Sequence, residues 1–138
     1  MAKLTRFGVS MEGELLAQFD ELIRQLGYAN RSEAIRDLVR GRLVQREWEA
    51  GEEVVGVIVL LYDHHKRELA DRLTDLQHGY HDLIAATMHI HLDEDNCLEI
   101  LAVRGLGPKV QDLADRLCSL KGVKHGKLAA TSTGRHLK

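Results

Sequence analysis

The stretch from Thr87 to Glu99, Thr-Met-His-Ile-His-Leu-Asp-Glu-Asp-Asn-Cys-Leu-Glu, decides the fold of the second half of this chain. Side chains alternate between the two faces of a strand, so His89 and His91 share one face and the apolar residues between them share the other. An acidic turn at 93–96 then returns the chain as a second strand. Cys97 reaches the histidine face if it pairs with His91 across a five-residue loop, whereas a four-residue loop would put it on the apolar face.

The segments on either side of this hairpin complete a strand–helix–strand pattern that occurs twice. Short apolar or alternating runs predict strands at 54–62, 83–92, 97–104 and 123–130, and apolar residues at helical spacing predict helices at about 66–77 and 108–120. The order β-α-β-β-α-β is the split, ferredoxin-like arrangement. Residues 132–138 have no apolar pattern and are expected to form a loose tail.

The first fifty residues predict a smaller unit. Alternation in Leu4–Met11 predicts a strand, residues 12–26 carry a helical apolar stripe, and Asn30 with Glu33 resembles a capping box that opens a second helix. One strand cannot satisfy its own backbone hydrogen bonds, and so small a unit has too little core to fold alone. Two chains that pair their strands over four helices meet both requirements. The polar segment 46–53 is the expected boundary.

Composition limits the classes of function. The 138 residues are 44% hydrophobic and 29% charged, which indicates a folded chain. The longest apolar run, Val54–Tyr62, is far shorter than the roughly 20 residues of a membrane span, so we expect a soluble, cytoplasmic protein without membrane contact. The net charge of −2 hides an asymmetry, because residues 1–46 carry eight Lys/Arg against six Asp/Glu. That small basic excess is a weak argument for nucleic acid.

A paired N-terminal ribbon would have the shape to bind DNA. A two-stranded ribbon fits the major groove, where its exposed face reaches base edges. Arg6 can bond guanine through two hydrogen bonds, and Ser10 can bond either base. Asn30, Arg31 and Ser32 open the second helix with free N–H groups and a positive dipole end, which favour a phosphate. The alternative interpretation is a dimerisation ribbon beside an ordinary capped helix.

The hairpin carries ligands that a borderline transition metal prefers. The three candidates on one face are His89, His91 and Cys97. One position is left to fill, and His78, at the end of the preceding predicted helix, is a candidate that a symmetry-related chain could supply. Three nitrogens and one sulfur suit Ni(II) or Cu(II) in a plane and Zn(II) in a tetrahedron. Tyr62 and Glu99 are candidates to orient a ligand from behind.

Taken together, these patterns resemble known families. The N-terminal unit, with Arg6-Phe-Gly-Val-Ser10 and Asn30-Arg-Ser-Glu-Ala-Ile-Arg, resembles the ribbon-helix-helix DNA-binding proteins. Followed by a β-α-β-β-α-β unit with His-x-His and Cys, it looks like the nickel-responsive transcriptional regulator family. The resemblance implies an α+β chain with a ribbon-helix-helix DNA-binding domain at 1–48 and a ferredoxin-like (ACT-type) metal-binding and tetramerisation domain at 53–131.

The resemblance also implies an activity and an assembly. Members form a homotetramer, a dimer of dimers, that binds double-stranded DNA, and the expected function is repression of nickel-uptake genes at a palindromic operator when Ni(II) is bound. Square-planar Ni(II) would be held by His89, His91 and Cys97 of one subunit and His78 of another. No enzymatic activity is expected.

Further roles follow from position within the family. Arg6 and Ser10 match base-contacting positions, while Gly8 departs from members that carry a hydroxyl residue there. Lys66 and Arg67 match a pair that contacts the DNA backbone. Glu33 and Asp37 match a cation-binding position between domains, although by themselves they are typical of a solvated helix face. From the residues alone, the cluster His64-His65-Lys66-Arg67 indicates either a low-affinity metal site or a surface that faces phosphate.

Three other interpretations remain open at this point. A regulator on the same plan could sense an amino acid, although the stretch Tyr62–Lys66 lacks the Gly-rich loop that such domains use. The His and Cys residues could hold a structural zinc. A metalloenzyme is disfavoured, because four protein ligands leave no open position for water.

Overall fold

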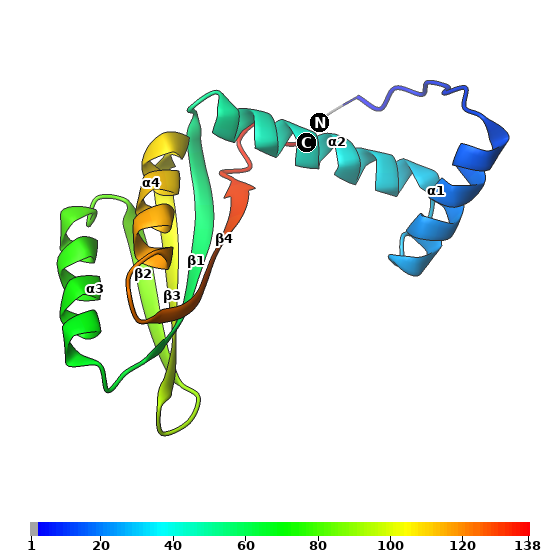
Figure 1. The fold of residues 1–138 in the computed structure, drawn as a ribbon. Coiled ribbons are helices and arrows are strands. Elements are labelled where there is room, and N and C mark those ends of the chain that lie inside the picture. Colours follow the sequence, from blue (N-terminus) through cyan, green and yellow to red (C-terminus); the bar gives the residue numbers. More distant parts are fainter. Residues whose placement is uncertain (1–2) are drawn as a thin grey trace. The chain divides into compact units, whose positions relative to one another are not determined.

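The computed structural model describes residues 3–138, so the first two residues of the predicted 1–48 domain lie outside the described residues. Contacts divide the chain into two units (Figure 1). The N-terminal unit runs to Leu43 and includes His136–Lys138, and the C-terminal unit comprises Val44–Arg135. Each unit is described by itself below.

The N-terminal unit consists of two helices, α1 (Gly13–Gln25) and the first part of α2 (Arg31–Glu49). Gly27, at φ 84°, ends α1 as its position in the sequence predicts, since a left-handed residue is the common way to close a helix. Asn30 caps α2, because its side-chain oxygen accepts a hydrogen bond from the Glu33 amide at 2.9 Å. The Glu33 side chain pairs with Arg36, so the structure shows one half of the predicted capping box.

The predicted strand at Leu4–Met11 is not formed in the single chain, where residues 3–12 are neither helix nor strand. Phe7 and Val9, on the predicted apolar face, are 74% and 63% exposed. The physical reason is that a strand exists through its pairing, and the pairing expected for this segment is with a second chain.

Within the predicted boundary segment 46–53, α2 continues through Glu49. The Trp48 indole donates a hydrogen bond to the Thr131 carbonyl at 2.8 Å, and Glu47 is buried, so the end of α2 belongs to the C-terminal unit. Gly51, at φ 72°, ends the helix. The polar composition of this segment does not indicate a helix, and the helix packs on the rest of the C-terminal unit through Trp48.

The C-terminal unit is a four-stranded antiparallel sheet with helices on one face (Figure 1). In chain order its elements are β1 (Glu53–Asp63), α3 (Arg67–Gly79), β2 (Ile84–His91), β3 (Asn96–Leu106), α4 (Gly107–Cys118) and β4 (Val123–Ser132). The strand order β2-β3-β1-β4 fits the predicted ferredoxin-like arrangement. Alternate residues of β1 and β3 are buried against apolar residues of the helices: Val54, Ile58, Leu60, Leu101, Val103, Leu69, Leu73, Val110, Leu113 and Leu117.

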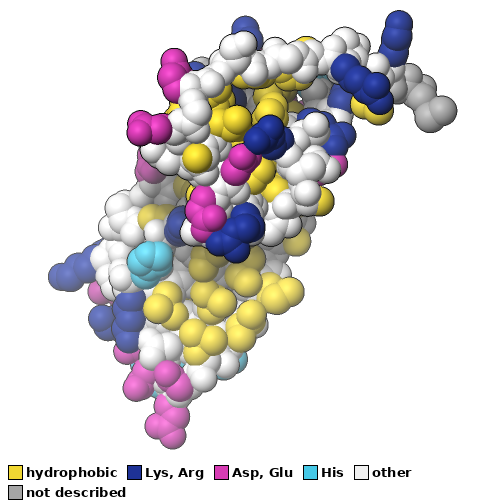
Figure 2. Space-filling view, turned by 90° about the vertical axis from the view of Figure 1, so that its right-hand side faces the viewer, with side chains coloured by type: hydrophobic (Ala, Val, Ile, Leu, Met, Phe, Trp, Pro, Cys, Tyr) yellow, Lys and Arg dark blue, Asp and Glu magenta, His cyan; other side chains and the backbone are white. Residues whose placement is uncertain are grey.

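The opposite face of this sheet is apolar and is not covered by the helices. Met88, Ile90 and Leu92, which alternate with the histidines, are 58%, 37% and 53% exposed. Figure 2 shows hydrophobic side chains gathered over the C-terminal unit in its lower half. The two faces of the hairpin therefore differ in chemistry as the sequence predicts, with histidines toward the helices and apolar residues away from them.

Candidate metal centre and nucleic-acid interface

The register of the β2–β3 hairpin places the candidate metal ligands on one face. His91 pairs with Cys97 and His89 pairs with Glu99, so five residues separate His91 from Cys97, the connection that the face argument requires. The turn is fixed by Asp93, whose side chain accepts hydrogen bonds from the Asn96 side chain and from the amides of Asp95 and Asn96. These bonds, the one from the Asn96 side chain foremost, lower the pKa of Asp93 to about 2.

The ligand candidates on this face differ in their exposure. Cys97 lies on the central strand β3 and is 2% exposed, whereas His89 lies on the edge strand β2 with 55% of its side chain exposed. His91 is also exposed, and its ring meets that of His64 edge-on with centroids 5.2 Å apart. A thiol buried below two exposed imidazoles makes a donor set that opens toward the sheet edge.

A buried carboxylate supports this face. Glu99 is 1% exposed and accepts hydrogen bonds from the Tyr62 hydroxyl at 3.1 Å and from the Gln77 amide at 2.7 Å. The His89 Nε2 lies 3.5 Å from Glu99, and its Nδ1 lies 3.4 Å from the Tyr62 hydroxyl. Burial, then the Glu99 charge, then Cys97 raise the pKa of Tyr62 well above its ordinary value, so Tyr62 remains a donor. The predicted supporting residues therefore contact a candidate ligand.

His78 lies apart from the other candidates. It is exposed on the last turn of α3, next to Gln77, which reaches inward to Glu99. Consecutive residues of a helix point about 100° apart, so the exposed His78 does not share the inward direction of Gln77. A histidine in this position is available to another subunit.

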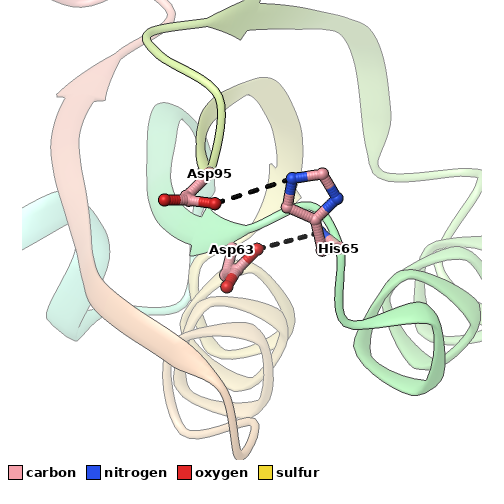
Figure 3. Close-up of side chains that lie close together, drawn as sticks. All are labelled: Asp63, His65 and Asp95. Carbon is pink, nitrogen blue, oxygen red and sulfur yellow. Dashed lines mark hydrogen bonds and ion pairs between the residues drawn. The ribbon is translucent and has the colours of Figure 1, made fainter.

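In the single chain the candidate nickel ligands do not converge on one point. Within residues 3–138, the group whose potential ligand atoms all lie within 4.8 Å of one another is instead Asp63, His65 and Asp95 (Figure 3). Sequence reasoning named His65 in a cluster that could bind a metal, but it missed Asp63 and Asp95. The signal that identifies the group is the pairing of Asp63 with Asn96 at the end of the β1–β3 ladder, which brings the hairpin turn beside the end of β1.

The candidate DNA-contacting residues of the N-terminal unit are at its surface. Arg6 and Ser10 are exposed on the unpaired segment, and Ser32 is exposed at the start of α2. Asn30 caps that helix. Arg31 makes a two-bond ion pair with Asp20 of α1, both bonds at 2.8 Å, and this pairing lowers the pKa of Asp20. In this structure Arg31 therefore ties the two helices together.

The remaining candidates lie at the start of α3 and on α2. Lys66 and Arg67 are exposed where α3 begins, directly after the loop that contacts the hairpin turn. Asp37 accepts hydrogen bonds from the Tyr28 hydroxyl at 2.8 Å and from Arg40 at 2.9 Å, and Glu33 pairs with Arg36. Both carboxylates predicted to bind a cation thus have arginine partners within their own unit.

Comparisons with known proteins agree with the fold. Residues 5–46 match the family model described as ribbon-helix-helix protein, copG family, and residues 55–131 match the one described as NikR C terminal nickel binding domain. A protein of Geobacter sulfurreducens is 54% identical over 99% of both chains, and one of Nitratidesulfovibrio vulgaris is also 54% identical over 99% of both. Each bears the name "Putative nickel-responsive regulator".

A solved structure resembles the chain in fold alone. It is that of an uncharacterized protein of Thermotoga maritima, TM1266, with a TM-score of 0.52 and 14% sequence identity. The alignment covers 57% of this chain and 98% of the other.

A ribbon-helix-helix segment followed by a nickel-binding domain defines a DNA-binding protein that responds to a metal. The chain belongs to the nickel-responsive regulator family, and its metal is Ni(II). This is a family of transcription regulators and not of enzymes. Over the described residues, no helix combines the length and the apolar character needed to cross a bilayer.

Proposed function

We propose that this protein represses nickel-uptake genes by binding a palindromic operator when Ni(II) occupies sites shared between subunits of a homotetramer. The observation that carries the proposal is the pairing of His91 with Cys97, beside a His89 supported by Glu99. The family match and the N-terminal helices support DNA as the partner.

The donor set fits the metal. Two imidazoles and one thiol on a sheet face, with His78 offered by another subunit, supply three nitrogens and one sulfur, a set that suits planar Ni(II). The thiol must lose its proton and the imidazoles must be neutral to bind, so acid weakens the affinity. When bound, Ni(II) supplies a four-coordinate link between two subunits.

The chain's own residues prepare this site. Glu99 lies by the Nε2 of His89 and Tyr62 by its Nδ1, so nickel would replace one of these two contacts while the other holds the ring. Cys97 is buried on β3 and pairs with His91 on the neighbouring edge strand, so its thiol would be the ligand nearest the centre of the sheet. A second subunit that brings His78 then completes the set and joins two dimers.

Apolar surface supports an assembly of several copies. The N-terminal segment and both helices line a groove with Phe7, Val9, Phe19 and Ile35 in its walls, which a second copy of the segment would close by pairing. The open face of the C-terminal sheet offers a second apolar surface. Two separate surfaces of this kind are what a dimer of dimers requires.

DNA contact is proposed for exposed polar residues of both units. Arg6 and Ser10 would reach base edges from the ribbon, and the start of α2 at Asn30, Arg31 and Ser32 would bind phosphate. Arg31 would have to exchange Asp20 for the phosphate. Lys66 and Arg67 would contact the backbone. Regulation then follows by linkage, since nickel shifts DNA binding only by its differential affinity for the two arrangements of the dimers.

A comparison of the two cysteines tests the proposal. Cys97→Ala should lose the thiolate–Ni(II) charge-transfer absorption, which a zinc protein cannot give, and should no longer bind a nickel-uptake promoter more tightly when nickel is added. The matched control is Cys118→Ala, which removes the other thiol and should keep both. In the wild type, nickel should raise DNA affinity by about 5–150-fold, the usual range of allosteric coupling. A Cys97→Ala protein with unchanged nickel-dependent DNA binding would refute the assignment.

A further inference from the structure

The turn of the β2–β3 hairpin meets the loop between β1 and α3, and three side chains of types that can bind a metal converge there (Figure 3). Asp63 ends β1, His65 lies in the loop, and Asp95 lies in the turn. A potential ligand atom of each lies within 4.8 Å of the other two. His65 and Asp95 are exposed and Asp63 is half-buried, so the group opens to solvent.

The backbone holds these segments together independently of the three side chains. Asp63 is paired with Asn96 in the β1–β3 ladder, and the His64 amide donates a hydrogen bond to the Asp95 carbonyl at 3.1 Å. The backbone therefore brings these three segments together, whatever rotamers their side chains adopt.

The three side chains already contact one another. The Asp63 carboxylate accepts a hydrogen bond from the His65 amide at 2.9 Å, which leaves its second oxygen for another partner. The His65 Nε2 lies 3.6 Å from the Asp95 carboxylate and 2.7 Å from the Glu94 carbonyl. Lys124, beside this turn, donates a hydrogen bond to the Asn96 side chain at 2.6 Å.

We propose that Asp63, His65 and Asp95 form a second metal site, one for a divalent first-row transition ion whose remaining ligands are water. One imidazole and two carboxylates make an oxygen-rich donor set, which suits Mn(II) and similar ions and differs from the thiolate set of the nickel site. Two ligands bound at about 2.1 Å lie at most about 4.2 Å apart. The His65 Nε2 and the Asp95 carboxylate, 3.6 Å apart, are already within that limit.

A change of tautomer would make the His65 Nε2 available to a metal ion. Because the Glu94 carbonyl can only accept, the His65 Nε2 carries a proton in the present arrangement. Binding through Nε2 requires the tautomer with its proton on Nδ1. The cost of releasing the Glu94 carbonyl predicts a weaker site than a preformed one.

An ion at this position would join two functional parts of the molecule. It would fix the hairpin turn, whose strands carry His91 and Cys97, to the loop that leads into Lys66 and Arg67 at the start of α3. The site itself does not depend on the proposed nickel function, because none of its three residues is a predicted nickel ligand.

Binding of Mn(II) to the full-length chain tests the site, measured as loss of the electron paramagnetic resonance signal of free Mn(II). Mn(II) is the suitable probe because it prefers carboxylate and water to thiolate. Losing a residue that merely orients a ligand costs 10–100-fold in affinity, so Asp95→Asn and His65→Ala, which remove ligands, should each weaken binding at least about tenfold. The matched control is Glu94→Gln, which removes the same charge from the same turn and should bind as the wild type does.

Two further measurements separate this site from other causes of Mn(II) binding. Bound Mn(II) should broaden the backbone amide resonances of residues 63–65 and 93–96 first, and the Cys97→Ala variant should bind Mn(II) as the wild type does. Equal weakening by Glu94→Gln and Asp95→Asn would mean diffuse attraction to an acidic turn and would overturn the proposal. Loss of binding in Cys97→Ala, or broadening centred elsewhere, would also overturn it, whereas failure of the nickel assignment alone would leave it intact.

Discussion

At Glu99 a buried carboxylate accepts hydrogen bonds from Tyr62 and Gln77 while its charge faces His89. Replacement by Gln keeps the shape but removes the charge, and it sets an amide N–H₂ against one of the two donors. We expect Glu99→Gln to lower nickel affinity by about 10–100-fold, because residues that orient a metal-binding histidine have effects of this size. Competition with a chelator of known nickel affinity would measure it.

A matched comparison isolates the role of the charge. Tyr62→Phe removes one donor to Glu99 and leaves the carboxylate in place, so its loss of nickel affinity should be the smaller of the two. If Tyr62→Phe were the more damaging variant, orientation of His89 would depend on the hydroxyl and not on the charge.

Individual residues also show what sequence can and cannot predict. The common face of His89, His91 and Cys97 followed from alternation along a strand, a property of the backbone alone. The engagement of Arg31 by Asp20 did not, because it depends on how α1 meets α2. Gln77 carried no signal either, since nothing local indicates that a glutamine on α3 reaches a carboxylate on β3.

Between elements, the end of α3 is joined to α4 by the Tyr80 hydroxyl, which donates a hydrogen bond to Asp112 at 2.6 Å. This bond is the main cause that lowers the pKa of Asp112. We expect Tyr80→Phe to raise that pKa toward the ordinary value, as measured by following the side-chain carboxyl by NMR during an acid titration. Arg116→Gln should raise it less, because the charge of Arg116 is a lesser cause.

The sign of the pH effect follows from the lowered pKa. A group whose pKa is lower in the folded than in the unfolded chain stabilises the fold above its ordinary value, here 3.8, and loses that contribution as the pH falls through the folded value. The wild type should therefore lose more stability than Tyr80→Phe on acidification below about pH 4. Equal acid sensitivity of the two proteins would contradict the assigned cause.

The packing of α4 on β4 depends on a residue without a side chain. A Cβ added at Gly126 would lie 2.6 Å from the Cys118 sulfur and 3.0 Å from the Cys118 Cα. Because backbone is involved, rotation of the cysteine cannot relieve the clash, and Gly126→Ala should destabilise the chain by about 1–3 kcal/mol. Urea denaturation would measure the loss. Gly13→Ala, where nothing lies within 4 Å, should stay within about 0.5 kcal/mol of the wild type.

At the scale of elements, periodicity predicted the helices and the sheet strands to within a few residues, because each has one buried stripe or face. It failed at two places where the partner is not local in sequence. The segment Leu4–Met11 has the pattern of a strand but no strand beside it in the single chain. The end of α2 has a polar composition, and it is helical because Trp48 packs on the C-terminal unit and bonds Thr131.

For the whole molecule, the separation of His78 from the hairpin makes the shared nickel site testable by mixing two inactive chains. His78→Ala keeps His89, His91 and Cys97 but cannot offer the fourth ligand, and Cys97→Ala keeps His78 but cannot form the acceptor set. Each variant alone should lack the thiolate–Ni(II) absorption. Tetramers reassembled from an equal mixture should regain it at about a quarter of the sites, where the two intact halves meet across an interface.

Reassembly of wild-type chains with His78→Ala chains is the control, since half of their sites should form whichever chain supplies His78. The mixture of the two variants is decisive. If His78 bound nickel within its own chain, no mixed tetramer could contain an intact site, because every chain in it would lack either His78 or Cys97. Recovery of the absorption, and with it of nickel-dependent DNA binding, requires that one subunit donate the histidine that its neighbour's hairpin leaves out.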